Sequence, residues 1–300
     1  MILQTTGITK SFGDNNVLKG ISLQVESGSA LGILGRNGAG KTTLIRIIMG
    51  VFPQDSGEVL IDGKTINRND LKIGYLPEER GLYAKKIILD QLIYFAQLKG
   101  MNISDAKKSA MHWLERLEMQ QYVKRRLDTL SKGNQQKIQL VATLISNPDI
   151  IILDEPFSGL DPVNAFLLKD VVKEQISAGK IVLFSSHQMN YIEEFCDDIA
   201  ILNSGNIVLG GSLKSIKRSY DRSRIIISTI EADKLKAFTD NELKDIVLST
   251  QIDDNILDVK MSSESEKTQF LEKLSAKKFD IDEIKVYEPT LNEIFMEYTK

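Results

Sequence analysis

The chain has 300 residues, of which 42% are hydrophobic and 26% charged, a composition typical of a globular protein with one large core or two smaller ones. Its 38 basic and 41 acidic residues give a net charge of −3, so the totals favour neither a polyanion-binding surface nor a polybasic membrane anchor, and nucleic acid is not expected as a partner. The single cysteine, Cys196, excludes an internal disulfide and a multi-cysteine zinc site and favours a cytoplasmic location.

The chain shows no signal for secretion or for crossing a membrane. Its N-terminal residues lack a basic region followed by an apolar stretch, so we expect no secretory signal there. No uncharged apolar run approaches the roughly 20 residues that a membrane-spanning helix needs. Any membrane role is therefore expected to come through a partner.

The first part of the chain is rich in strand signals. Apolar and polar residues alternate over residues 21–25, and residues 58–61 run into the turn Asp62-Gly63. Residues 31–35 form a short apolar run, which is followed by glycines and then by a helical pattern over residues 44–48. These features predict a β-rich start and then a buried strand, a loop and a helix.

Helical spacing replaces the strand signals between about residues 82 and 145, which predicts a helical subdomain inserted into the sheet domain. The apolar runs at residues 150–153 and 181–184 are typical of strands buried on both faces, and a helix is predicted between them at residues 162–177. Such alternation of strand and helix predicts a parallel sheet covered by helices.

After about residue 217 the chain becomes more polar, which predicts a linker and a second domain. Strands are expected at residues 224–230, 246–249, 256–261 and 281–287, and capping boxes at Ser263 with Glu266 and at Thr290 with Glu293 mark helix starts. The last helix is expected to place Leu291, Ile294, Phe295 and Tyr298 on one stripe. The order of these elements favours a βαββαβ, ferredoxin-like module.

A phosphate-binding loop is predicted at residues 35–42, which read Gly-Arg-Asn-Gly-Ala-Gly-Lys-Thr. Its position after a buried strand and at the start of a helix argues against a chance glycine-rich turn. Glycines let several backbone N–H groups converge on phosphates, and the helix N-terminus adds favourable partial charge. Lys41 is expected to reach the β- and γ-phosphates of a nucleotide, and the Thr42 hydroxyl to ligate Mg²⁺.

Two adjacent carboxylates, Asp154 and Glu155, follow the buried strand at residues 150–153. Mg²⁺ can compensate their charge, so Asp154 is predicted to hold the metal, directly or through water. Glu155 then points to the other side of the strand and is a candidate general base for the attacking water. The alternative is a strand that ends in solvent with two hydrated acids.

His187 follows the strand at residues 181–184 and is predicted to emerge at the same sheet edge as the phosphate loop and Glu155. There it would sense the γ-phosphate and orient Glu155 and the water, whereas a lone histidine is more often structural or exposed. His112 has no such context and is expected on a helix surface.

The strongest resemblance lies at residues 130–135, which read Leu-Ser-Lys-Gly-Asn-Gln and precede Asp154. Together with the phosphate loop, the carboxylate pair, residues 158–161 and His187, in this order, they resemble the signature motif and motif set of ABC-family ATPases. The resemblance covers about residues 1–215. It implies an α/β P-loop NTPase fold of the ABC type over residues 1–216, with an antiparallel β subdomain and the helical subdomain at about 82–145. A small α+β accessory domain would follow at residues 217–300.

The resemblance also implies roles for individual residues. Phe12 resembles the aromatic residue that stacks on adenine, and Val17 would line the same face. Ser131 and Gly133 resemble the signature residues that contact the γ-phosphate bound by the opposite protomer. Asp161 resembles the residue that links the two sites across the dimer, and an N-cap before Pro162 is an equally compatible role. The residues that would contact the phosphates of ATP are Asn37, Gly38, Ala39, Gly40, Lys41, Thr42 and Thr43.

Three positions depart from the family pattern. Lys132 stands where glycine is usual in the signature, and Asn134 stands where glutamine is usual. Glu78 occupies the place of a glutamine that contacts Mg²⁺ and the nucleotide, and its carboxylate is still expected to reach the metal. Coupling between ATP and the helical subdomain is therefore expected to survive.

The resemblance is closest to ATPase subunits of sodium-extrusion and drug- or peptide-export systems, some of which end in a pattern similar to residues 289–295. It implies a head-to-tail pair of chains that encloses two ATP molecules and drives separate integral-membrane permease subunits from the cytoplasmic face of the cell membrane. A soluble ABC ATPase of translation or DNA repair is the alternative, although this chain has one cassette and no long coiled coil. A GTP-binding switch is less favoured, because residues 67–70 only loosely resemble a guanine-recognition motif.

Overall fold

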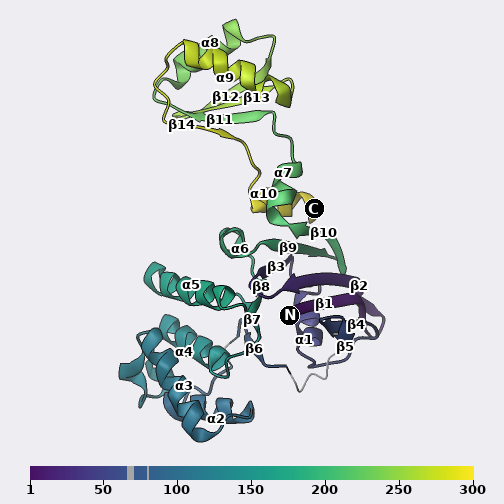
Figure 1. Cartoon of the computed structure of the whole chain (residues 1–300), viewed down its shortest axis with the longest axis vertical. Coiled ribbons are helices and arrows are strands. Elements are labelled where there is room, and N and C mark those ends of the chain that lie inside the picture. The colour runs from purple at the N-terminus through teal and green to yellow at the C-terminus, as the bar shows by residue number, and fades with distance from the viewer. Residues whose placement is uncertain (66–70, 80) are drawn as a thin grey trace. The chain divides into compact units, whose positions relative to one another are not determined.

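The computed structural model describes residues 1–65, 71–79 and 81–300. These residues form two compact units, one made of Met1–Leu213 with Ile294–Lys300 and the other of Lys214–Glu293 (Figure 1). The units differ from the predicted ranges 1–216 and 217–300 chiefly at the C-terminus, where the last residues join the first unit. Packing explains the difference: Ile294 is fully buried, and the side-chain amide of Asn203 donates a hydrogen bond of 3.2 Å to the carbonyl oxygen of Tyr298.

The first unit contains an antiparallel sheet with the strand order β2-β1-β4-β5. Its strands are β1 (Ile2–Phe12), β2 (Asn15–Glu26), β4 (Ser56–Ile61) and β5 (Lys64–Thr65). Alternate residues of β1 and β2, among them Leu3, Ile8 and Ile21, are buried in the core. The alternation seen in the sequence therefore marks one covered face, as predicted for the start of the chain.

A second sheet of the first unit has the order β10-β9-β3-β8-β7-β6. Its strands are β3 (Ala30–Gly35), β6 (Ile73–Leu76), β7 (Ile150–Asp154), β8 (Ile181–Ser185), β9 (Asp198–Asn203) and β10 (Asn206–Ser212). All neighbours are parallel except β9 and β10, which form an antiparallel hairpin at the edge. Every residue of β7 and β8 is buried, which confirms the two strands predicted from continuous apolar runs.

Helices cover this parallel sheet and form an insertion between β6 and β7 (Figure 1). The covering helices are α1 (Lys41–Ile48), α5 (Pro162–Ser177) and α6 (Met189–Phe195). The insertion contains α2 (Ile88–Leu98), α3 (Ile103–Arg116) and α4 (Lys132–Leu144), with short 3-10 turns at Gln120–Tyr122 and Leu127–Thr129. The predicted α/β fold with an antiparallel β part and an inserted helical part is confirmed.

The second unit is an α+β module whose elements follow the order β-α-β-β-α-β, that of a ferredoxin-like module. They are β11 (Arg224–Ser228), α8 (Ala232–Glu242), β12 (Val247–Asp253), β13 (Ile256–Met261), α9 (Lys267–Ala276) and β14 (Glu283–Val286), and the sheet order is β12-β13-β11-β14. A 3-10 turn at Glu264–Glu266 starts with the predicted capping box of Ser263 and Glu266. The helices α7 (Leu213–Ser219) and α10 (Leu291–Tyr298) lie at the two boundaries between the units.

No helix in the described ranges combines the length and the hydrophobicity that a membrane span requires.

Candidate active site

The loop between β3 and α1 adopts a conformation that only glycine accommodates easily. Gly38 has a φ of 82° and Gly40 a φ of 109°, both in the left-handed region. A Cβ added to Gly40 would lie 2.6 Å from the Cδ2 atom of Leu18 and 3.1 Å from the carbonyl oxygen of Val17, so a side chain at this position would be both strained and crowded. The loop is therefore free to present backbone N–H groups at the start of α1, as a phosphate-binding loop requires.

A cavity of about 490 Å³ lies beside this loop. Its lining contains nine of the predicted nucleotide-binding residues: Val17, Asn37, Gly38, Ala39, Gly40, Lys41, Thr42, Thr43 and Glu78. Asn15 and Arg36 line it as well, although the sequence did not single them out as ligands. The structure thus brings Glu78, which follows β6, next to the phosphate loop that follows β3.

Phe12 does not belong to the lining of this cavity. Its side chain is 49% exposed at the end of β1, and its ring meets the Phe52 ring edge-on at a centroid distance of 5.7 Å. The ammonium of Lys10 lies 5.6 Å from the centre of the Phe12 ring. One aromatic face is thus used by a cation, and adenine stacking by Phe12 stays a prediction.

Glu155 is the most tightly held acid at the carboxyl edge of the parallel sheet. It is 7% exposed and has a φ of 50°, which turns the chain sharply after β7. Its Oε1 atom accepts a hydrogen bond of 2.8 Å from the His187 backbone N–H, and Oε2 accepts one of 2.9 Å from the Ser186 hydroxyl. The Nδ1 atom of the His187 ring lies 2.7 Å from Oε1. Glu155 and His187 are therefore hydrogen-bonded to each other, as their predicted common location implies. Ser186 is a further hydrogen-bond partner of Glu155, and nothing in the sequence pointed to it.

Asp154 lies one residue earlier and is also buried. The Tyr75 hydroxyl on the neighbouring strand β6 donates a hydrogen bond of 3.3 Å to its Oδ2 atom. Burial, and then the charge of Asp154, raise the pKa of Tyr75 to about 12, so this hydroxyl keeps its proton. Tyr75 is a partner of Asp154 that sequence spacing could not reveal, because the two residues meet only through strand pairing.

Lys41 lies in the field of several carboxylates. Its ammonium donates hydrogen bonds to the carbonyl oxygens of Gly35 at 2.6 Å and Arg36 at 3.3 Å. Burial lowers the pKa of Lys41, while the charges of Asp154, Glu155 and Glu78 act in the opposite direction. Three carboxylates thus lie within the electrostatic reach of the Lys41 ammonium.

The oxygen atoms at this edge fit Mg²⁺. Thr42 offers a hydroxyl, and Asp154 and Glu78 offer carboxylates, which are the hard ligands that this ion prefers. In the described ranges no group of three or more His, Cys, Asp and Glu side chains could hold a metal by itself. Mg²⁺ commonly binds through one or two carboxylates plus phosphates and water, so this donor set suits it.

The signature residues form the start of α4 and pack against the start of α5. Ser131 is the N-cap of α4, with its hydroxyl accepting from the Asn134 backbone N–H at 3.4 Å. A Cβ on Gly133 would lie 3.0 Å from the Nδ2 atom of Asn164, so this glycine allows close packing. Asp161 caps α5 and accepts from the Asn164 backbone N–H at 3.0 Å, which confirms its N-cap role. Ser131, Gly133 and Asp161 are not among the described residues that line the nucleotide cavity.

The segment that carries Glu78 is tied to α4. The buried amide of Gln139 donates hydrogen bonds to the carbonyl oxygens of Pro77 at 3.1 Å and Glu79 at 3.2 Å. The Thr143 hydroxyl lies 3.2 Å from the carbonyl oxygen of Tyr75. A shift of this segment therefore moves the same helix whose N-terminus carries the signature. Residues 67–70, which resembled a guanine-recognition motif, lie outside the described residues.

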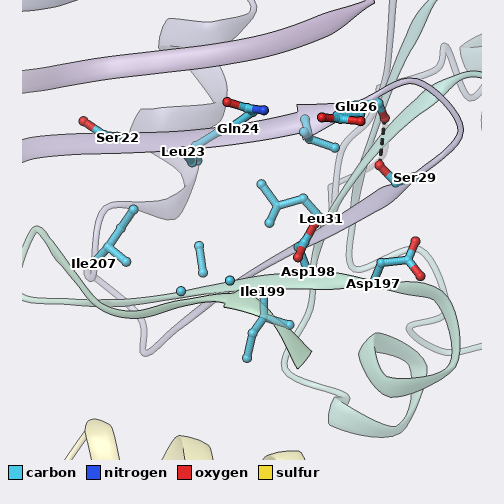
Figure 2. Close-up of a pocket in the computed structure, with 14 residues that line it drawn as sticks. Ser22, Leu23, Gln24, Glu26, Ser29, Leu31, Asp197, Asp198, Ile199 and Ile207 are labelled. Atoms are coloured by element: carbon cyan, nitrogen blue, oxygen red, sulfur yellow. Dashed lines mark hydrogen bonds between the residues drawn. The ribbon is translucent and has the colours of Figure 1, made fainter. Parts of the chain in front are cut away.

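A larger hollow of about 680 Å³ lies elsewhere in the first unit, between β2 and the hairpin β9–β10 (Figure 2). Figure 2 shows the carboxylates of Glu26, Asp197 and Asp198 along it. Burial and the charges of Asp197 and Glu26 raise the pKa of Asp198. None of the predicted site residues lines this hollow, so its size does not make it the active site.

Comparison with known proteins places the chain among ABC transporter ATP-binding proteins in sequence similarity. A family model described as "ABC transporter" matches residues 18–158, and one described as "ATP-binding protein DrrA1-3-like, C-terminal domain" matches residues 211–299. The uncharacterized ABC transporter ATP-binding protein YhaQ of Bacillus subtilis is 40% identical over 97% of this chain and 96% of its own length. NatA of Bacillus subtilis, an ABC transporter ATP-binding protein, is 33% identical over 76% of this chain and 98% of its own.

Two further matches extend the comparison. The linearmycin resistance ATP-binding protein LnrL of Bacillus subtilis is 29% identical over 99% of this chain and 98% of its own length. Among solved structures, an ATP-binding subunit of an ABC transporter has a TM-score of 0.67 and 28% identity, over 73% of this chain and 92% of its own. The dimeric structure of the bacterial ABC transporter cassette MJ0796 has a TM-score of 0.63 and 26% identity, over 70% of this chain and 98% of its own.

Proposed function

Since this chain belongs to the family of ABC transporter ATP-binding proteins, we propose that it drives an exporter of sodium, a drug or a peptide by coupling ATP-dependent dimer closure to a separate membrane permease. The hydrogen-bonded group of Glu155, Ser186 and His187 beside the phosphate loop is the observation that carries this proposal. It provides a fixed base at the point where a γ-phosphate would be attacked.

The phosphate loop holds the substrate. Backbone N–H groups from Gly38 to Thr42 and the ammonium of Lys41 bind the phosphates of ATP, with the α1 N-terminus behind them. Mg²⁺, when bound by Thr42 and Asp154 with Glu78 nearby, neutralises charge on the β- and γ-phosphates. Val17 lines the same cavity.

Glu155 acts as the general base for the attacking water. Both of its carboxylate oxygens accept hydrogen bonds from the segment after β8, so its orientation is fixed before a nucleotide arrives. The ring of His187 is mostly exposed, with Nδ1 directed at Glu155, and its other nitrogen is free to contact the γ-phosphate. Ser186 is a positioning residue, because it acts through Glu155.

A second copy of the chain completes each site. ABC ATPase subunits dimerise, and the likeness to the dimeric MJ0796 cassette supports the same arrangement here. Ser131 and Gly133 of one copy cover the γ-phosphate held by the other, and Asp161 links the two sites. Loss of the γ-phosphate removes charge-assisted contacts to both copies, which lets the dimer reopen.

The permease docks on the helical subdomain. Tyr83, Lys86, Asp90, Gln91 and Tyr94 line a hollow of about 310 Å³, which we name the aromatic hollow. Tyr83 is 53% and Tyr94 47% exposed, and aromatic side chains of this kind are enriched in protein interfaces. A permease segment in this hollow would hold the chain peripherally on the inner face of the membrane.

Export is the direction that the relatives favour. Linearmycin resistance ATP-binding protein LnrL and the Nod factor export ATP-binding protein I of Ralstonia nicotianae, 29% identical over 70% of this chain and 67% of its own length, carry export or resistance in their names. The C-terminal module of the DrrA1-3-like type supports the same assignment.

Co-purification from membranes tests this proposal. The tagged full chain is expected to retain an integral-membrane protein after detergent extraction, and Tyr94→Asp is expected to lose that protein. Val51→Asp is the matched control, because Val51 is also exposed but lies outside the hollow. Recovery of ribosomes or DNA in place of a membrane protein would contradict the assignment.

A further inference from the structure

Two segments of the helical subdomain run side by side and gather five cations. The Ile88 N–H donates to the carbonyl oxygen of Arg125 at 2.9 Å, and the Leu127 N–H donates to that of Lys86 at 3.2 Å. A β-bridge joins Ile87 and Arg126 in the same ladder. We name the exposed side chains of this ladder the basic ridge, made of Lys85, Lys86, Lys124, Arg125 and Arg126.

Most of this charge is not neutralised within the chain. Arg126 forms an ion pair with Asp128, and the Arg125 guanidinium lies 5.6 Å from the centre of the Tyr122 ring. Lys85, Lys86 and Lys124 form no ion pair with any other described residue. Asp90, beside Lys86 in the aromatic hollow, and Asp128 are the nearby acids. The ridge is therefore strongly positive, although the whole chain has a net charge of −3.

The ridge is fixed in place by a buried glutamine and is flanked by exposed apolar side chains. Gln91 accepts from the Tyr83 backbone N–H at 3.1 Å and donates to the carbonyl oxygen of Lys86 at 3.4 Å. Ile87 lies between the cations and is 39% exposed, and the exposed rings of Tyr83 and Tyr94 adjoin them. The paired backbone segments thus hold the cations and the exposed Ile87 side chain close together.

We infer that the basic ridge binds the phosphate headgroups of anionic phospholipids, while the exposed Ile87 side chain enters the boundary below the headgroups. The inference rests on the proposed function, which places this subdomain at the cytoplasmic face of a membrane. A phospholipid surface fits better than nucleic acid, because an exposed isoleucine between cations matches the layered polarity of a bilayer interface. The lipid contact would orient the chain next to its permease.

Vesicle flotation of the purified full chain tests the inference without the permease. The chain is expected to float with phosphatidylcholine vesicles that contain phosphatidylglycerol and to stay behind with phosphatidylcholine alone. High salt is expected to release it, because screening shortens the reach of surface charge. Equal binding to both kinds of vesicle would overturn the inference.

Charge reversal on the ridge gives the matched comparison. Lys85→Glu with Lys124→Glu, two ridge cations outside the aromatic hollow, is expected to raise the lipid concentration for half-maximal flotation at least about tenfold, since each cation near such a surface contributes about a fivefold factor. Lys107→Glu with Lys108→Glu makes the same charge change on exposed positions of α3 and is expected to bind nearly as the parent does. Unchanged ATP binding checks that both variants fold.

The two proposals fail separately. A chain that floats with anionic vesicles but retains no membrane protein on co-purification would support the lipid inference and contradict the permease assignment. A ridge variant that floats as the parent does but no longer retains the permease would show a protein contact at the ridge and overturn the lipid inference. A control variant that loses flotation as strongly as the ridge variant would overturn it as well.

Discussion

Glu155 illustrates how the chemistry depends on single residues. The carboxylate receives hydrogen bonds from the Ser186 hydroxyl and the His187 N–H, so Glu155→Gln keeps the shape but removes the proposed base. This variant is expected to bind ATP, to hydrolyse it at least about a hundredfold more slowly, and to persist as a dimer with Mg²⁺ and ATP. Size-exclusion chromatography with ATP measures the dimer, and Lys41→Ala, expected to lose nucleotide affinity, serves as the control. A Glu155→Gln chain that stays monomeric and still turns over ATP would contradict the assignment.

Ser186 permits a finer test at the same carboxylate. Ser186→Ala removes the hydrogen bond to Oε2 while leaving both contacts from His187. We expect kcat to fall by about tenfold, the equivalent of one hydrogen bond to a charged group, with KM for ATP nearly unchanged. Ser186→Thr keeps a hydroxyl and is expected to restore most of the rate. A variant in which KM rises and kcat does not would assign Ser186 to binding instead of positioning.

Cys196 gives a prediction about pH and accessibility. Burial raises the pKa of its thiol from the ordinary value of 9.0, so the folded chain favours the protonated form. Because the unfolded thiol ionises first, the contribution of Cys196 to stability is complete below about pH 9 and falls as the pH rises further. Native protein is expected to resist iodoacetamide, and urea-unfolded protein to react at once. Rapid labelling of the native chain would show that Cys196 is accessible.

Some residues of the candidate site could be predicted from the sequence, and others could not. The common location of the phosphate loop, Asp154, Glu155 and His187 could be predicted, because each follows an apolar run that predicts a strand, and parallel strands end at one edge. Tyr75 and Ser186 were missed as partners of the acids, since they lie 79 and 31 residues away along the chain from the carboxylates they contact. Only the pairing of strands brings such residues together.

At the level of elements, the contact between α4 and the segment after β6 gives a stability prediction. Gln139 is buried and satisfies the carbonyl oxygens of Pro77 and Glu79. Gln139→Leu would leave both oxygens without this donor and is expected to cost about 1–3 kcal/mol of the free energy of unfolding. Urea denaturation measures it, with Gln97→Leu on the exposed face of α2 as the control. No difference between the two variants would mean that other donors replace the amide.

Element types were predicted better than element order in the sheets. Local periodicity marked β7 and β8 and the helices of the insertion, because burial of a strand or of one helix face leaves a pattern in the sequence. The position of β9 beside β3, and of β10 as an antiparallel edge strand, depends on contacts between distant segments. No local pattern carries that information.

At the scale of the whole molecule, the return of Ile294–Lys300 to the first unit predicts how the chain can be divided. A chain that ends at Leu213 loses the fully buried Ile294 and is expected to be less stable than one in which a flexible linker replaces Lys214–Glu293. The burial of one such side chain contributes about 1.5–3 kcal/mol. Thermal unfolding of the two shortened chains compares them. Equal melting temperatures would show that the final residues add nothing to the first unit.

The covalent path has a mechanical consequence. The second unit leaves the ATP-binding unit at one point and re-enters it at another, so it is an insertion held by two tethers. A module on one tether can swivel through any number of turns, whereas two tethers wind around each other and limit rotation. A twisting force on the second unit would therefore act on the first unit at two places, after β10 and at the final helix α10.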